Sequence, residues 1–178
     1  MGNKNLKDPI TRASQIHIDY GNFKMYIVIV MRNEKGIQKI RIKCEEIEKI
    51  PQIVTNFENI IELYFDSCDL QSFPIWIKKL INLEILCLRA CNLTVLDESI
   101  KALHNIKLLD LSMNPMGSLP EFIYDLENLE YLYLPDDKYE YFSKSMLKLK
   151  HLKYVFFPYS ERGEFDKDDI LDYLKSNK

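Results

Sequence analysis

A spacing of apolar residues that recurs every 23 residues constrains this chain more than any other feature of its sequence. A period of this length is typical of solenoids, in which each coil buries its apolar side only by stacking on its neighbours. The clearest copy runs from Leu83 to Asn105. Its apolar positions are Leu83, Leu86, Leu88, Leu93, Leu96, Ile100 and Leu103. We therefore expect one stacked core rather than separately folded parts.

The same positions recur on both sides of this copy. Two copies precede it, Ile37 to Asn59 and Ile60 to Asn82, and two follow, Ile106 to Asn128 and Leu129 to His151. A sixth strand, Leu152 to Phe157, begins a copy that stops. Six strands are thus expected. They centre on Ile40 to Ile42, Leu63 to Phe65, Leu86 to Leu88, Leu109 to Leu111, Leu132 to Leu134 and Val155 to Phe157.

Each position in the repeat has a physical role. Leu86 and Leu88 lie two residues apart, so on an extended chain both point to the core. The next position, Cys91 or Asn114, falls inside a bend, where Asn can bond the backbone and Cys acts as a small apolar residue with a weak donor. A less regular limb then returns the chain. On it, we interpret Trp76 and Phe122 as packing between coils, with a convex contact patch as the alternative.

This pattern resembles the leucine-rich repeat family in its 23-residue form, with an LPxxI return limb like that of intracellular Ras-group repeat proteins. The resemblance implies an α/β fold: a right-handed solenoid with a parallel β-sheet on its concave face. It also implies protein partners, often signalling proteins such as small GTPases. Repeat one departs from the pattern with Glu45 at the bend position, and repeat five with Asp137, Tyr139 and Phe142.

The repeats have distinct segments at both ends. Residues 1–13 are polar and without period, and we expect a flexible leader. Residues 14–36 alternate in polarity around Gly21-Asn22, which predicts a β-hairpin that caps the solenoid. Residues 158–178 are expected to be a loop and a capping helix, with Asp166 as N-cap and Phe165 and Ile170 as a hydrophobic staple. The whole of 14–178 is then one domain, with repeats over 37–157.

Composition favours a soluble domain with a protein partner. The chain has 178 residues, is 47% hydrophobic and carries a net charge of −3. No basic run favours nucleic acid, no apolar stretch approaches the length of a membrane span, and Met1 to Thr11 lacks a signal peptide's apolar segment. We expect a cytoplasmic monomer.

The sequence offers no pattern typical of catalysis. The four cysteines include no CxxC pair, and His17, His104 and His151 are scattered, so we expect free thiols and neither metal nor cofactor. Cys68 and Cys91 share a position in adjacent coils, which leaves a disulfide as an alternative, and Cys87 is expected to point outward. We predict a non-enzymatic interaction module that acts in signalling or as a scaffold. The alternatives are a secreted or surface-exposed adhesive repeat protein, and an enzyme with an unrecognised loop site.

The outward positions of the strands predict the binding face. Outward residues 23 positions apart line up across the strands in three columns. The first column is Lys39, Glu62, Ile85, Leu108, Tyr131 and Tyr154, and the second is Arg41, Tyr64, Cys87, Asp110, Tyr133 and Phe156. The third column is Lys43, Asp66, Arg89, Ser112, Pro135 and Pro158. The face thus grades from cationic to aromatic. We predict that Tyr131, Tyr133, Tyr154 and Phe156 bind the partner and that Tyr64, Arg89 and Asp110 orient it.

Two considerations limit this prediction. The segment after Pro158 could instead fold back over the four rings, because a terminal cap must lie close by. The face is also small, roughly 29 by 14 Å or about 400 Å². A standard interface takes about 800 Å² from each partner, so the partner is expected to be a helix, a peptide or one edge of a domain.

Overall fold

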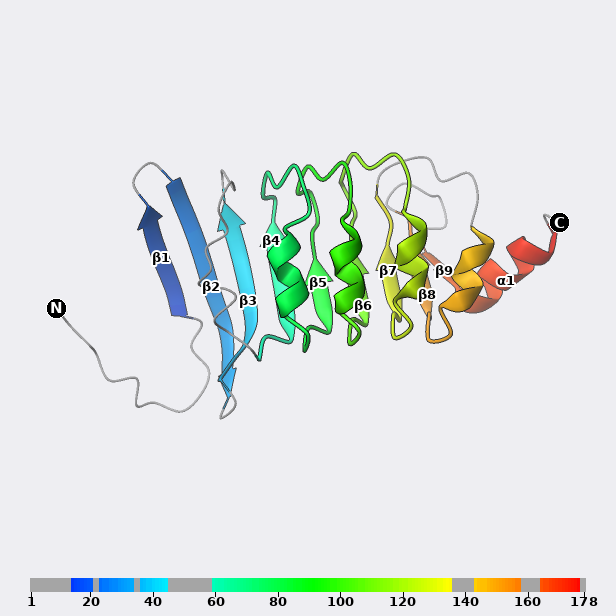
Figure 1. Cartoon of the computed structure of the whole chain (residues 1–178), viewed down its shortest axis with the longest axis horizontal. Helices are drawn as coiled ribbons and strands as arrows, with labels where there is room; N and C mark the ends of the chain where they lie inside the picture. The colour runs from blue at the N-terminus through cyan, green and yellow to red at the C-terminus, as the bar shows by residue number, and fades with distance from the viewer. Residues whose placement is uncertain are drawn as a thin grey trace.

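Nine strands form a single sheet in chain order in the computed structural model, which describes residues 14–20, 23–33, 36–44, 59–135, 143–157 and 164–176 (Figure 1). The strands are β1 (Ser14–Tyr20), β2 (Phe23–Asn33), β3 (Gly36–Cys44), β4 (Glu62–Asp66), β5 (Ile85–Cys87), β6 (Leu108–Asp110), β7 (Tyr131–Tyr133), β8 (Tyr154–Phe156) and β9 (Glu164–Asp166). The expected leader, residues 1–13, lies outside the described residues, as do Gly21-Asn22, Glu45, Asp137, Tyr139, Phe142 and Pro158.

The six repeat strands, β3 to β8, pair in parallel throughout. Leu63 is aligned with Leu86, Leu86 with Leu109, and Leu109 with Leu132. Each strand residue is therefore paired with the residue 23 positions later in the next strand. The parallel solenoid sheet expected from the spacing is confirmed. A slip of one residue would turn every buried leucine outward, which explains why this register is strongly specified.

Each described return limb contains one short 3-10 helix, and these helices form a layer over one face of the sheet (Figure 1). They are η2 (Ile75–Lys79), η3 (Glu98–Ala102), η4 (Glu121–Asp125) and η5 (Lys144–Lys148). Pro74 and Pro120 precede two of them, whereas Asp97 and Ser143 precede the others and accept a hydrogen bond from the backbone two residues ahead. The fixed φ of proline and the side-chain cap of Asp or Ser are therefore alternative ways to begin the 3-10 helix of a return limb.

The core lies between the sheet and the return limbs. Leu63, Leu86, Leu109, Leu132 and Val155 are fully buried in successive strands. On the limbs, Trp76 and Phe122 are partly buried against this core, and the Trp76 ring lies 6.5 Å from that of Phe65. Both side chains therefore pack against the core, and their packing between coils stays a prediction.

A sharp bend follows the strand in three successive coils. Ser67, Ala90 and Met113 hold the same repeat position, and each has a positive φ, of 51°, 53° and 59°. The left-handed conformation turns the backbone out of the sheet, where its N–H and C=O groups lose their strand partners. A buried residue must then satisfy them.

Asn114 satisfies the backbone inside this bend. Its amide oxygen accepts hydrogen bonds from the backbone N–H groups of Cys91 and Leu93 in the preceding coil, at 2.9 and 3.0 Å. Its amide nitrogen donates to the carbonyls of Leu88 and Leu111, at 2.8 and 2.7 Å. Its expected role is confirmed.

The two cysteines at the equivalent position are also buried. The thiol of Cys68 donates to the carbonyl of Ile42 at 3.5 Å, and that of Cys91 donates to the carbonyl of Arg89 at 3.3 Å. The alternative disulfide between these two residues is not formed. Three successive coils, those of Cys68, Cys91 and Asn114, therefore each contribute one buried residue to a ladder along the solenoid.

The two ends of the sheet are antiparallel. β1 and β2 form the expected hairpin, and β2 pairs with β3. At the other end β9 pairs with β8, with Val155 opposite Phe165. The sequence predicts a loop up to Glu164, whereas the structure pairs Glu164–Asp166 as a ninth strand. That either end segment serves as a cap stays a prediction.

The expected helix follows β9 as α1 (Lys167–Ser176). A carboxylate oxygen of Asp166 accepts hydrogen bonds from the backbone N–H groups of Asp168 and Asp169, both at 2.9 Å, so the predicted N-cap is confirmed. Ile170 is buried, and the Phe165 ring packs edge-on against Phe157 at 5.2 Å. Among the described residues, no helix is long and apolar enough to cross a membrane.

Candidate functional site

The sheet face opposite the return limbs carries the predicted columns of side chains. In the first column, Glu62 is aligned with Ile85, Leu108 with Tyr131, and Tyr131 with Tyr154. The second column aligns in the same way, from Arg41 in β3 to Phe156 in β8. The structure therefore places the residues of the first two columns on adjacent strands, as the period predicts.

Four rings gather at the carboxy-terminal end of these columns, and we refer to Tyr131, Tyr133, Tyr154 and Phe156 as the ring cluster. Tyr133 and Phe156 are stacked, with ring centres 4.2 Å apart and planes 7° from parallel. Tyr131 and Tyr154 are stacked at 6.0 Å, and Tyr154 meets Phe156 at 6.1 Å. One continuous aromatic surface thus spans two strands.

This surface lies outside the core. Leu132 and Val155, the residues between the rings on each strand, are fully buried on the other side of the sheet, whereas Tyr154 is 38% exposed. The described part of the carboxy-terminal segment extends the sheet at its edge, as β9, and its Phe165 contacts the core-side ring of Phe157. Residues 158–163, which belong to the predicted cover, lie outside the described residues.

The amino-terminal end of the same face is polar and internally paired. Lys39 forms an ion pair with Glu62 at 2.7 Å, and the Tyr64 hydroxyl donates to the same carboxylate at 2.9 Å. The Lys39 ammonium and the Arg41 guanidinium lie 4.8 and 5.1 Å from the centre of the Tyr64 ring. The bond to Glu62 raises the pKa of Lys39, and partial burial followed by that same bond raises the pKa of Tyr64.

The middle of the face differs from the expectation at two residues. Asp110 is 8% exposed, and its carboxylate accepts from the backbone N–H and the hydroxyl of Ser112, at 2.9 and 2.6 Å. Cys87 points outward, as expected, but it is half-buried, and its thiol donates to Asp110 at 3.5 Å. Burial and the Asp110 charge raise the pKa of this thiol to about 12, which disfavours the thiolate at neutral pH.

These contacts alter the predicted roles. Asp110 is engaged within its own coil, and Arg89 is exposed but lies beyond the end of β5, where the third column leaves the sheet. Ser112 and Pro135 of that column are buried. The structure thus brings Tyr64 and the ring cluster onto the strands of one face and sets Arg89 apart from them.

A charge ladder borders the first column and was missed by sequence reasoning. Glu84 pairs with Lys107 at 2.8 Å, and Glu130 pairs with Lys153. The four hold one repeat position with alternating sign, which was the signal that could have revealed them. The bond to Lys153 lowers the pKa of Glu130, and the same bond raises that of Lys153.

Among the described residues, no group of three His, Cys, Asp or Glu side chains is placed to hold a metal ion. The face presents a partly exposed aromatic surface beside ordered charges, and aromatic residues are enriched at the centres of protein interfaces.

Comparison with known proteins bears on the fold. No protein-family model and no curated protein matches the chain. Its structure is similar to that of the LRR protein LIC12759 of Leptospira interrogans, with 31% identity and a TM-score of 0.55, over 60% of this chain and 27% of that one.

Two further solved structures are similar. An internalin, inlF, from Listeria monocytogenes is 17% identical with a TM-score of 0.55, over 68% of this chain and 34% of that one. The leucine-rich repeat domain of the type III effector XopL is 23% identical with a TM-score of 0.57, over 69% of this chain and 45% of that one. The chain spans less than half the length of each.

Proposed function

We propose that this chain, which has the leucine-rich repeat fold, is a non-catalytic interaction module that binds a protein or peptide on its concave sheet face. The ring cluster is the centre of the site. Tyr64 lies at the polar end of the same face, where Lys39 and Glu62 border it, and Arg89 contributes from the rim.

One observation carries this proposal: four rings lie on the outer side of strands whose inner side is already filled. Their burial would contribute nothing to the core beneath, since Leu132 and Val155 are fully buried without them. A cluster of stacked rings that remains partly exposed indicates a surface that a partner covers. The paired charges at the other end limit which partners fit.

The partner is a narrow element. The face measures about 400 Å², roughly half of what one side of a standard interface takes. A helix, a peptide or one edge of a domain matches that area. We further propose that the chain is a cytoplasmic monomer that acts as a scaffold in signalling, which cell fractionation and sedimentation would test.

Removal of two stacked rings tests the site. Tyr133→Ala with Phe156→Ala takes away the closest stacked pair, which contributes about 0.5–1.5 kcal/mol to stability, so the double variant should remain folded. Partner capture from the native source, read by mass spectrometry, should be lost. A variant that retains its partners would contradict the proposal.

A matched control removes apolar surface from the return limbs. Ile75 and Leu147 are 52% and 54% exposed on η2 and η5, on the other side of the sheet. Ile75→Ala with Leu147→Ala should capture the same partners as the unaltered chain. Loss of capture in this control alone would move the site to the convex side.

A further inference from the structure

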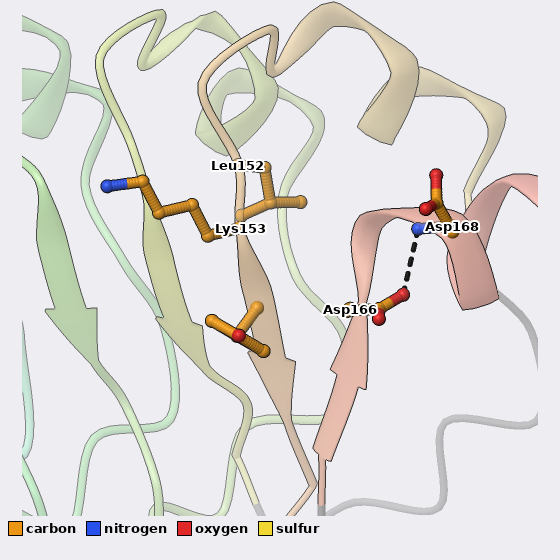
Figure 2. Close-up of a pocket in the computed structure, with 5 residues that line it drawn as sticks. Leu152, Lys153, Asp166 and Asp168 are labelled. Atoms are coloured by element: carbon orange, nitrogen blue, oxygen red, sulfur yellow. Dashed lines mark hydrogen bonds between the residues drawn. The ribbon is translucent and has the colours of Figure 1, made fainter.

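Tyr154 of the ring cluster lies beside two carboxylates. β8 and β9 place Tyr154 directly opposite Asp166, so both side chains project from the same face of the sheet. Together with Asp168, Lys153 and Leu152 they line a shallow depression of about 310 Å³ at the sheet edge (Figure 2). The most exposed ring of the cluster is therefore bordered by negative charge.

The cations near the other tyrosines of this face are already placed. Lys39 and Arg41 lie against the ring of Tyr64, and Lys153 lies 5.6 Å from the centre of the Tyr131 ring. Lys153 lines the depression, but its side chain extends away from Asp166 and Asp168 and pairs with Glu130 (Figure 2). Among the described residues, no cation lies over the ring of Tyr154.

The two carboxylates retain capacity for a partner. Both side chains are exposed, and one oxygen of Asp166 accepts the two backbone N–H groups that begin α1. Within the described part of the chain, the other oxygen of Asp166 and the carboxylate of Asp168 accept no hydrogen bond. The first turn of α1 carries the carboxylates of Asp168 and Asp169, whose like charge would repel an anionic ligand.

From this charge distribution we infer that the partner of the concave face is a peptide segment that places an Arg or Lys side chain over Tyr154, between Asp166 and Asp168. Apolar side chains of the same segment cover the stacked rings of Tyr133 and Phe156. An aromatic face with adjacent carboxylates attracts a cation both through the ring quadrupole and through ion pairing. The inference rests on the proposed function and adds the chemistry of the partner.

A peptide library tests this inference on the full chain. Random 12-residue peptides on phage are selected on the immobilised protein, and enriched sequences are synthesised with each Arg or Lys replaced by Gln. We expect enriched peptides to combine one Arg or Lys with apolar residues. Titration calorimetry should show that one such replacement weakens binding about tenfold, as loss of a cation–π contact and ion pairs implies.

Variants of the protein locate the cation. Asp166→Asn with Asp168→Asn removes both charges while Asn keeps the helix cap, and binding should weaken about tenfold. Glu98→Gln with Glu127→Gln changes the net charge equally on exposed positions away from the sheet and should leave binding unchanged. The Asp168→Arg variant should not bind the cationic peptide. It should bind the same peptide with Glu in place of its Arg more tightly than the unaltered protein does.

Distinct outcomes overturn the inference and the proposed function. The inference is wrong if selection yields no peptide. It is also wrong if every selected peptide lacks Arg and Lys; where the binding of such peptides is lost in the Tyr133→Ala, Phe156→Ala variant, the proposed function still holds. Peptides that bind that variant unchanged would contradict both. Sedimentation showing a dimer that the ring substitutions dissociate would make a second copy the occupant and would likewise contradict the inference.

Discussion

Substitution of Asn114 tests whether the buried ladder holds the coils together. Asn114→Ala removes the oxygen that accepts the backbone N–H groups of Cys91 and Leu93, and the nitrogen that donates to the carbonyls of Leu88 and Leu111. The residue is 1% exposed, so water does not replace these partners without opening the bend. The change therefore leaves buried polar groups unsatisfied in two coils at once.

The structure sets the size of the effect. An unsatisfied buried donor costs about 1–3 kcal/mol, so loss of the acceptor for two N–H groups should lower the free energy of unfolding by about 2–6 kcal/mol. Asn114→Cys should cost less than Asn114→Ala, because Cys occupies this position in two coils. In the coil of Cys68, the backbone N–H of Leu70, which corresponds to that of Leu93, bonds to the Cys91 carbonyl at 2.9 Å rather than to a side chain.

Urea unfolding followed by circular dichroism measures these differences. Asn105→Ala is the matched control, because Asn105 is exposed and its amide donates to one carbonyl, that of Ile81 at 2.9 Å. That substitution should cost about 1 kcal/mol or less. If Asn114→Ala and Asn105→Ala lower the free energy of unfolding equally, the ladder does not have the role assigned to it.

Three further predictions concern single groups. The Cys87 thiol, with its pKa raised to about 12, should resist alkylation at pH 8 in the native chain. Asp110→Asn should lower that pKa and speed the alkylation. Equal alkylation rates in the two proteins would contradict the effect of Asp110 on this thiol. Because the pKa of Glu130 is lowered in the folded chain by Lys153, its contribution to stability is present above the ordinary value of 4.5 and is lost as pH falls below it. The stability deficit of Glu130→Gln seen at pH 7 should therefore shrink towards pH 3, and a deficit that is independent of pH would be inconsistent with the pair. Asp166→Ala should lower the free energy of unfolding of the carboxy-terminal helix by about 1 kcal/mol, measured by hydrogen exchange, whereas Asp166→Asn should have little effect; equal losses would exclude the capping role.

The repeat period predicts the sheet because two spacings reinforce each other. Residues two apart, such as Leu86 and Leu88, fix which side of a strand is buried, and the 23-residue period then aligns each strand with the next. The same register also determines which outward side chains lie next to each other on adjacent strands. The alignment of Tyr133 with Phe156 was therefore predictable before any distance was known.

The sequence does not reveal features that depend on how a strand ends. β9 has three residues, too few to show an alternation, and its pairing depends on where the preceding segment returns. Asp110 was predicted to face a partner, but its strand ends there and Ser112 turns back to bond it. Local side-chain to backbone bonds of this kind leave no periodic signal.

Site-specific photo-cross-linking tests the central claim, that the partner covers the ring cluster. A photoreactive phenylalanine analogue at position 154 replaces the 38% exposed Tyr154, and the same analogue at Leu147, 54% exposed on η5, samples the return limbs. We expect a cross-linked partner from position 154 and none from position 147. A cross-link from position 147 alone would contradict it.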